Sequence, residues 1–502
     1  MNLATIIDPH PDDAVAVISR SKATTYGELR TQVAGLRGGL LGLGLEPGDR
    51  VGIVAANNWY FVVSYLAVLS AGCVAVPINP TSPVPEVQGE LAAIGARMVI
   101  AGPKARAVVT GLDRSALPAL ETIVLSQGEE APGALVLDDL VRSEPEAMVE
   151  RQPDDLAVLS FTSGTAGSPK AAMLTHGNLL SNLEQCQDHP GRQQGPDDVA
   201  FGVLPLFHIF GLNVALGLSL MAGAAVLLVE RFDPQTAIES IVNHGVTVIS
   251  GAPTMWSAWA SLPGAPADAF ATVRLAASGA ARLDPATRRT IEERFGLELT
   301  EGYGLTEASP VVTSGIGQAA PEGSIGVPLP GVHVRLVDAD GHDSLVGDAG
   351  ELWVCGPNVF AGYWNDADAT RSALTDDGWL RTGDIAVVDD DGFLFLVDRA
   401  KDLVIVSGFN VYPAEVEEVI TSHPGVVQAA VIGVPHPHSG EAVKAYVVVE
   451  PGVSVEEDDI IQHCEAHLAR YKCPQKVMFV DEIPQSATGK VLRKELRAAE
   501  VG

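Results

Sequence analysis

Hydrophobic and polar residues alternate along the first half of the chain in a pattern that predicts helices between buried strands. Leu29, Val33 and Leu36 recur at helical spacing, and Thr25 followed three residues later by Glu28 forms a capping box at the start of this helix. Short apolar runs typical of covered strands occur at 50–55, 73–77, 98–101, 121–125 and 246–250. Because helical patterns separate these runs, we expect a layered α/β architecture with parallel sheets.

The pattern changes after Gly331, where closely spaced strands with Gly and Asp turns are predicted at 332–337, 350–354, 385–388 and 393–397. This indicates a small β subdomain at about 331–400. A further α+β pattern follows, with helices at 413–422 and 455–468 and strands at 427–433 and 442–449. We therefore expect a large N-terminal region, residues 1–400, and a smaller C-terminal domain, residues 401–502, joined at a hinge at Lys401.

Residues 199–229 contain no charged residue and are long enough to cross a bilayer. Pro205 and the interspersed glycines instead predict buried strands, turns and helix, so we expect no membrane span. The first residues lack a secretory signal, and five scattered cysteines give no CxxC pair, which fits a cytoplasmic protein. Peripheral membrane association and a homodimer stay open.

The charge balance is strongly acidic, with a net charge of -31 at pH 7. A protein that binds the nucleic-acid backbone needs a broad positive surface, so the composition argues against a nucleic-acid partner. Solvated acidic faces that keep the protein soluble are the simpler interpretation.

A Gly- and hydroxyl-rich segment from Thr162 to Lys170 follows a strand-like run at 156–161. Glycines let a backbone approach a polyanion closely, hydroxyls and amides donate to phosphate oxygens, and Lys170 adds positive charge. The spacing differs from that of a Walker loop. An ordinary polar turn is the plain alternative.

This segment resembles the phosphate loop of the adenylate-forming superfamily, which includes acyl-CoA synthetases, luciferases and peptide-synthetase adenylation domains. Two positions depart from the family pattern, since Ala166 replaces a hydroxyl residue and Ala171 replaces a glycine. Further segments resemble the same family in the same order, at 205–211, 301–307, 379–384 and 484–494. The resemblance spans nearly the whole chain, is closest to fatty-acid:CoA ligases, and implies an ATP-dependent acid:CoA ligase that uses Mg²⁺, with CoA as co-substrate.

The resemblance implies a set of nucleotide-binding residues. The phosphate loop residues are Thr162, Ser163, Gly164, Thr165, Gly167 and Lys170. Tyr303 would stack on the adenine, Asp384 and Arg399 would reach the ribose hydroxyls, and Glu307 would bind Mg²⁺ through a hard carboxylate. Thr306 would contact a phosphate or substrate oxygen.

The resemblance also implies two half-reactions. Lys490 would stabilise charge as the acid attacks the α-phosphate and forms an acyl-adenylate, with His208 beside the carboxylate. The C-terminal domain would then rotate about Lys401 and bring Gly408 to line the channel for the pantetheine arm of CoA. The implied catalytic residues are Lys490, His208, Thr306 and Glu307.

The acid-binding pocket is implied to be mainly apolar, which favours a medium- or long-chain fatty acid. Its expected residues are His208, Ile209, Gly211, Trp256, Ser278, Gly279, Ala280 and Gly304. A small dicarboxylate such as malonate stays an alternative because Arg282 is a nearby charge, although Ala258 stands where an arginine is expected. Aryl acids and transfer to a carrier-protein thiol are further alternatives. A catalytically silent nucleotide-binding protein is disfavoured because Lys490, Glu307 and Asp384 are all present.

Overall fold

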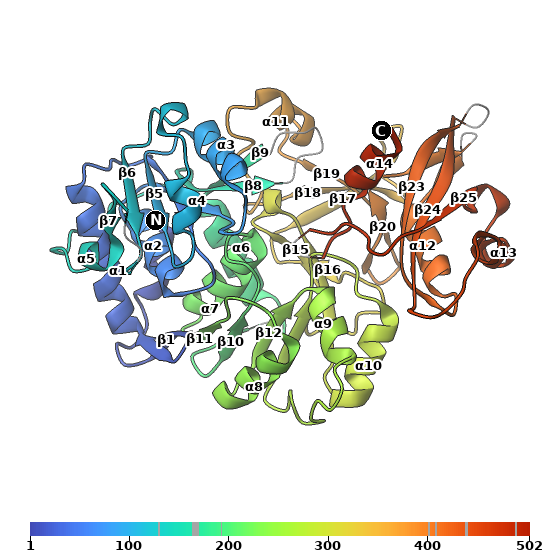
Figure 1. The fold of residues 1–502 in the computed structure, drawn as a ribbon, viewed down its shortest axis with the longest axis horizontal. Coiled ribbons are helices and arrows are strands. Elements are labelled where there is room, and N and C mark those ends of the chain that lie inside the picture. Colours follow the sequence, from blue (N-terminus) through green and yellow to red (C-terminus); the bar gives the residue numbers. More distant parts are fainter. Residues whose placement is uncertain are drawn as a thin grey trace. The chain divides into compact units, whose positions relative to one another are not determined.

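The computed structural model of the chain (Figure 1) describes residues 1–128, 131–162, 170–191, 193–399, 402–406, 409–436, 440–486 and 489–501. This part of the chain divides into two compact units. The first unit comprises Met1–His333 and Val354–Leu380, and the second comprises Val334–Trp353 and Arg381–Gly502.

One sheet of the first unit has the strand order β7-β6-β5-β3-β4-β8-β9. Its strands are β3 (Arg50–Val54), β4 (Val74–Ile78), β5 (Met98–Ala101), β6 (Thr122–Leu125), β7 (Leu135–Val136), β8 (Leu156–Thr162) and β9 (Lys170–Thr175). Neighbouring strands are parallel except β8 and β9, which form an antiparallel edge. The continuous apolar runs fit this arrangement because parallel strands are covered on both faces.

A second sheet of the same unit has the order β16-β15-β14-β13-β12-β10-β11-β1-β2. Its strands are β1 (Val15–Ser19), β2 (Lys22–Thr25), β10 (Val199–Gly202), β11 (Ala225–Leu228), β12 (Val248–Gly251), β13 (Leu275–Ser278), β14 (Thr300–Gly304), β15 (Val311–Ser314) and β16 (Val327–Pro328). The strands from β14 to β1 are parallel, with antiparallel pairs at both edges. The carboxyl ends of β12, β13 and β14 therefore lie along one edge of the sheet, where ligands bind in such folds.

Helices connect these strands and cover the sheets (Figure 1). They are α1 (Tyr26–Gly42), α2 (Trp59–Ser70), α3 (Val84–Ile94), α4 (Arg106–Thr110), α5 (Leu137–Leu140), α6 (His176–Asp188), α7 (Leu218–Met221), α8 (Pro234–His244), α9 (Pro253–Ala260), α10 (Pro285–Phe295) and α11 (Ala367–Ala373). The short turns are η1 (Leu3–Ile7), η2 (Arg114–Ala116), the π-helix η3 (Phe210–Gly217) and η4 (Thr306–Ala308).

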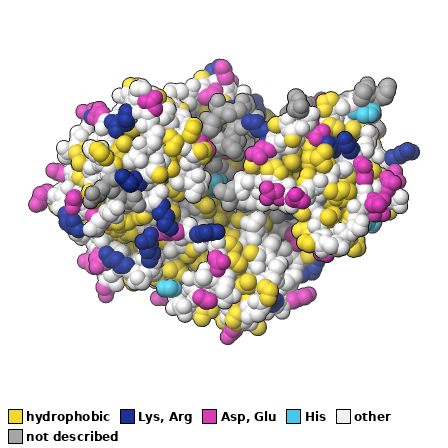
Figure 2. All heavy atoms as spheres, in the orientation of Figure 1, with side chains coloured by type: hydrophobic (Ala, Val, Ile, Leu, Met, Phe, Trp, Pro, Cys, Tyr) yellow, Lys and Arg dark blue, Asp and Glu magenta, His cyan; other side chains and the backbone are white. Residues whose placement is uncertain are grey.

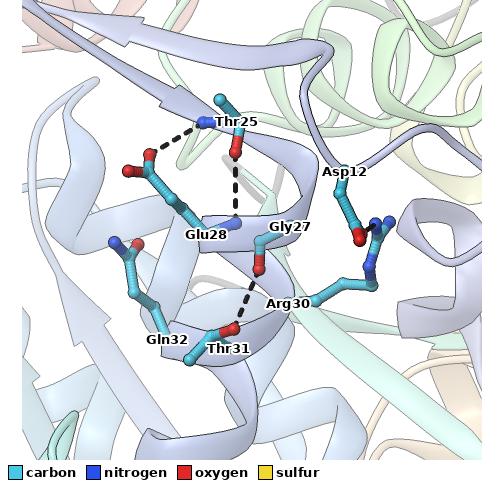
Figure 3. Close-up of a pocket in the computed structure, with 7 residues that line it drawn as sticks. All are labelled: Asp12, Thr25, Gly27, Glu28, Arg30, Thr31 and Gln32. Carbon is cyan, nitrogen blue, oxygen red and sulfur yellow. Dashed lines mark hydrogen bonds and ion pairs between the residues drawn. The ribbon is translucent and has the colours of Figure 1, made fainter.

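The capping box predicted for α1 is confirmed. The Glu28 backbone N–H donates to the Thr25 hydroxyl at 3.2 Å, and the Thr25 N–H donates to the Glu28 carboxylate at 3.0 Å. Figure 3 shows both bonds in a surface pocket lined by the first turns of α1. Two otherwise unpaired N–H groups at the start of the helix are thereby satisfied.

An aromatic cluster packs α9 and α10 against the second sheet. The ring centroids of Trp256 and Trp259 lie 5.2 Å apart, those of Trp259 and Phe270 also 5.2 Å, and those of Phe270 and Phe295 5.1 Å. Both tryptophans are wholly buried, and burying a large apolar side chain contributes about 1.5–3 kcal/mol. This core holds α9, and Trp256 with it, at the carboxyl end of β12.

The second unit contains two smaller sheets. The first has the order β17-β18-β19-β20, with β17 (His333–Val337), β18 (Gly350–Cys355), β19 (Leu380–Val388) and β20 (Leu394–Arg399). The other has the order β22-β21-β24-β23 with β25 beside β24, and its strands are β21 (Val404–Val406), β22 (Phe409–Val411), β23 (Val426–His436), β24 (Gly440–Val449) and β25 (Lys476–Phe479). Its helical elements are α12 (Pro413–Thr421), α13 (Glu457–His467), α14 (Arg493–Val501) and the turn η5 (Arg470–Lys472).

The uncharged stretch at 199–229 forms β10, η3, α7 and β11 rather than one long helix. Within the described ranges, no helix combines the length and hydropathy that a membrane span requires. Acidic side chains are scattered over the visible surface instead of gathering in one patch (Figure 2). This distribution fits the interpretation of the negative charge as solvated surface.

Candidate adenylate-forming site

The ends of the predicted phosphate loop are held together by the hairpin of β8 and β9. Thr162 ends β8 and Lys170 begins β9, and the two residues are register partners. The Thr162 hydroxyl donates to the Lys170 carbonyl oxygen at 3.4 Å. The predicted residues Ser163, Gly164, Thr165 and Gly167 lie outside the described residues.

The Lys170 side chain lies over an aromatic ring. Its Nζ atom is 5.2 Å from the ring centroid of Tyr363 and 4.0 Å from the Asp366 carboxylate. An ammonium group over a tyrosine face is attracted by the quadrupole of the ring. The contacts hold Lys170 at the exit of the loop.

The predicted adenine and metal motif begins in β14 and continues into η4. Tyr303 is largely buried, with 8% of its surface exposed, and pairs with Thr313 of β15. A Cβ atom built on Gly304 would lie 2.3 Å from the Pro310 carbonyl oxygen, so this close backbone approach requires glycine. Thr306 and Glu307 follow directly in η4.

Glu307 accepts a hydrogen bond from the Tyr363 hydroxyl at 2.6 Å. Burial, and then the adjacent Glu307 carboxylate, raise the pKa of Tyr363, so the phenol stays a proton donor. Glu307 keeps its second oxygen and further lone pairs for other ligands. Mg²⁺ is usually bound by one or two carboxylates together with substrate phosphates, so Glu307 fits the expected metal.

Sequence reasoning did not find Tyr363 as a site residue. Its place in the segment at 356–364 gives no signal of a role for an individual side chain.

The predicted gate for the acid lies at the start of the π-helix η3. The Phe210 N–H donates to His208 Nδ1 at 3.3 Å, so a neutral His208 imidazole carries its proton on Nε2. Ile209 is buried, and Gly211 lies inside the π-helix. Single π-helical turns inside helical segments are frequent at functional sites.

The expected acid pocket continues at the carboxyl ends of β12 and β13, where Gly251 and Ser278 are register partners. A Cβ atom built on Gly251 would lie 3.0 Å from the Trp256 indole nitrogen. One built on Gly279 would lie 3.0 Å from Cζ of Phe210. The Phe210 ring therefore closes directly against Gly279.

Two buried polar atoms lie on this face. Trp256 Nε1 and Ser278 Oγ have no hydrogen-bond partner among the described residues. Ser278 is the register partner of Gly251, and register partners in parallel strands point to the same side of a sheet. The Ser278 side chain therefore points to the side of the sheet on which the Trp256 indole lies beside Gly251. Ala280 follows with a positive φ of 72°, a conformation that costs a non-glycine residue free energy and is concentrated at functional sites.

In the second unit, Asp384 lies in β19 opposite Arg399 of β20. The aspartate is buried, with 6% of its surface exposed, and its N–H donates to the Thr382 hydroxyl at 3.1 Å. The Thr382 hydroxyl donates in turn to the Leu352 carbonyl oxygen at 2.6 Å. The Arg399 side chain lies outside the described part, as do the predicted hinge Lys401 and channel residue Gly408.

The predicted adenylation lysine lies on a tight loop before α14. The Ser486 N–H donates to the Lys490 carbonyl oxygen at 2.8 Å, and the Lys490 N–H donates to the Ser486 hydroxyl at 3.2 Å. Gln485 and Val491 form an isolated β-bridge beside them. These bonds join the two described ends of the loop, Ser486 and Lys490.

Known proteins resemble this chain over nearly its whole length. Residues 4–364 match the family model of the AMP-binding enzymes, and residues 415–490 match that of the AMP-binding enzyme C-terminal domain. A long-chain-fatty-acid–CoA ligase from Yersinia pestis is 38% identical, over 97% of this chain and 92% of the relative. A feruloyl-CoA synthase from Amycolatopsis sp is 37% identical, over 98% of this chain and 96% of the relative. The crystal structure of ATP-bound MatB from Rhodopseudomonas palustris superimposes with a TM-score of 0.91 at 34% identity, covering 99% and 98% of the two chains.

Proposed function

The chain belongs to the AMP-binding enzyme family, and from this premise we propose that it joins a medium- or long-chain fatty acid to CoA. The protein is an AMP-forming acid:CoA ligase whose substrates include ATP and CoA. The observation that carries the choice of acid is that the Phe210 ring closes against Gly279, while the neighbouring Ile209 and Trp256 side chains are apolar and buried.

The reaction takes place in two displacements. A carboxylate oxygen of the acid attacks the α-phosphorus of ATP, and pyrophosphate leaves with the electron pair of the broken P–O bond. The CoA sulfur then attacks the carbonyl carbon of the acyl-adenylate, AMP leaves, and the thiol proton passes to solvent. Bound Mg²⁺ would supply positive charge to the phosphate oxygens in the first step.

We assign Lys490 to the first step, where its ammonium group would stabilise the charge on the α-phosphate and the attacking carboxylate. The match of residues 415–490 to the family's C-terminal domain supports this role, and the Lys490 N–H holds its own backbone to the Ser486 hydroxyl at 3.2 Å. His208 would donate from Nε2 to the acid carboxylate, which fits the acceptor role of its Nδ1 toward Phe210.

Apolar surroundings favour an acid with an apolar body, because each buried methylene contributes about 0.8 kcal/mol. Ile209 is 1% exposed and Trp256 is wholly buried. The relative from Yersinia pestis, named a long-chain-fatty-acid–CoA ligase, supports the same choice.

The direct test is a thioesterification screen with ATP, Mg²⁺ and CoA over straight-chain acids of graded length, with release of AMP as the readout. We expect kcat/KM to rise with chain length to a maximum at a medium or long acid. A maximum at a short acid, or no AMP release with any straight-chain acid, would contradict the choice of a fatty acid.

A second candidate, an aryl acid that carries an oxygen substituent, is favoured by the unpartnered Trp256 Nε1 and Ser278 Oγ. Buried polar groups are normally hydrogen-bonded, and an unsatisfied one costs about 1–3 kcal/mol. A substituent oxygen of the substrate would supply a hydrogen-bond partner of the kind that such a group lacks. The relative named feruloyl-CoA synthase also supports an aryl acid. In the same screen, this candidate predicts faster turnover of hydroxylated than of unsubstituted aryl acids, with the preference lost in Ser278→Ala.

The residues give less support to a small dicarboxylate. Arg282 is exposed, and its positive charge acts on Glu301, where it opposes the rise in pKa that burial causes. Ala258 of α9 supplies no charge for a second carboxylate.

A further inference from the structure

The segment between β18 and α11 is hydrogen-bonded on one side to β9, the strand that follows the phosphate loop. The Met173 N–H donates to the Gly362 carbonyl oxygen at 2.9 Å, and the Ala361 N–H donates back to the Met173 carbonyl oxygen at 3.0 Å. Tyr363 forms an isolated antiparallel bridge with Ala172, so the segment continues the edge of the sheet beyond β9.

The same segment is fastened on its other side to η4. The Phe360 N–H donates to the Glu307 carbonyl oxygen at 2.9 Å, and the Asn358 side-chain amide donates to the Ala308 carbonyl oxygen at 2.8 Å. Asn358 is wholly buried. The backbone that carries Tyr363 is therefore tied both to the phosphate-loop strand and to the turn that carries Glu307.

The Tyr363 side chain spans these two elements. Its hydroxyl donates to Glu307 Oε1 at 2.6 Å, while its ring face lies 5.2 Å from Lys170 Nζ. The ring also makes an edge contact with Phe360, with centroids 4.9 Å apart. One tyrosine thus fixes the direction of the carboxylate and lies under the lysine at the end of the loop.

We propose that Tyr363 is a positioning residue that aims the Glu307 carboxylate at a divalent cation, an inference that rests on the metal role proposed for Glu307. A phenol has a single proton, so the bond to Oε1 orients the carboxylate while Oε2 stays available as a hard oxygen ligand. Partners that orient a metal ligand matter in general, because their mutation typically costs about 10- to 100-fold in metal affinity or activity.

The Tyr363→Phe variant separates this role from simple packing, because it keeps the ring over Lys170 and against Phe360 and removes only the hydroxyl. Binding of a non-hydrolysable ATP analogue is measured by calorimetry over a series of Mg²⁺ concentrations. The Mg²⁺ midpoint is the Mg²⁺ concentration that gives half of the maximal increase in affinity for the analogue. We expect this midpoint to rise about 10-fold or more in Tyr363→Phe. Analogue binding without Mg²⁺ and the melting temperature should stay close to wild type.

The matched control is Tyr60→Phe, which removes another tyrosine hydroxyl that is hydrogen-bonded to a carboxylate, that of Asp138. It should leave the Mg²⁺ midpoint unchanged. An unchanged midpoint in Tyr363→Phe would overturn the proposal, as would an equal loss of analogue binding with and without Mg²⁺.

The Glu307→Gln variant distinguishes failure of this inference from failure of the metal role itself. If Glu307→Gln shifts the Mg²⁺ midpoint and Tyr363→Phe does not, the positioning role alone is wrong. If Glu307→Gln leaves the midpoint unchanged, the metal role of Glu307 is wrong and the inference falls with it.

Discussion

The Arg493 guanidinium donates to both carboxylate oxygens of Glu417, at 2.7 Å each. Both side chains are largely buried, with 15% and 17% of their surface exposed. Arg493 begins α14 and Glu417 lies in α12, and Lys490 precedes Arg493 by three residues. The ion pair therefore anchors the segment with the proposed adenylation lysine to the body of the second unit.

Arg493→Ala should destabilise α12 and its neighbour β23, because removing one partner leaves a buried carboxylate uncompensated, at a cost of about 3 kcal/mol. Hydrogen exchange of amides in these two elements measures this directly, and about 100-fold faster exchange is expected. The control Lys472→Ala removes a more exposed ion pair to Glu415 on the same helix and should cost less than about 1 kcal/mol. Equal effects of the two variants would contradict the anchoring role.

Phe210→Ala should shift the acid preference toward longer or bulkier acids, because the Phe210 ring closes against Gly279. The ratio of kcat/KM for a longer acid to that for a shorter one should rise about 10-fold. Gly279→Ala should move the ratio in the opposite direction, since the added Cβ would lie 3.0 Å from the ring. The same proportional loss for every acid in both variants would show that Phe210 does not limit the pocket.

Stability should fall with acidification through His176, which is 1% exposed and accepts a hydrogen bond from the Leu3 N–H at Nδ1. Burial, with the positive charge of Arg151 as a smaller cause, lowers the pKa of His176 to about 4. An unfolded histidine titrates near pH 6.5, so between pH 6.5 and about 4 the unfolded chain binds a proton that the fold does not. The contribution of neutral His176 to the free energy of unfolding is fully present above pH 6.5. It is lost as the pH falls, and about 2 kcal/mol of it is gone at pH 5.

Thermal unfolding at pH 7 and pH 5 tests the role of this histidine. The His176→Asn variant, which keeps an acceptor near the Nδ1 position, should lose less stability between the two pH values than wild type. His244→Asn, at an exposed position of α8, should behave as wild type. Identical pH dependence in wild type and His176→Asn would refute the assignment.

The local pattern of hydrophobic and polar residues predicted much of the fold, because it indicates which faces of the helices and strands are buried. The capping box of Thr25 and Glu28 and the buried strands at 50–54 and 98–101 follow from residues close together in sequence. The pairing of β1 with β11, in which Val17 is the partner of Val226, could not be predicted in this way. No local pattern specifies a neighbouring strand that lies two hundred residues away in the sequence.

The same limit applies to the site. Gly304, Thr306 and Glu307 were predicted from a contiguous motif, whereas the Tyr363 hydroxyl reaches Glu307 across 56 residues of sequence. The periodicity of hydrophobic residues indicates which side chains are buried. It does not indicate which carboxylate accepts a hydrogen bond from a tyrosine hydroxyl. Only the packing of the 356–364 segment against both β9 and η4 brings this pair together.

The central claim is that Lys490 serves adenylate formation and not transfer to CoA, and separate measurement of the two half-reactions in Lys490→Ala tests it most directly. We predict a loss of at least about 100-fold in ATP–pyrophosphate exchange, with transfer of the acyl group from preformed acyl-adenylate to CoA close to wild type. Lys494→Ala, four residues away on the exposed side of α14, should leave both half-reactions unchanged. Equal losses of exchange and transfer in Lys490→Ala would contradict the account.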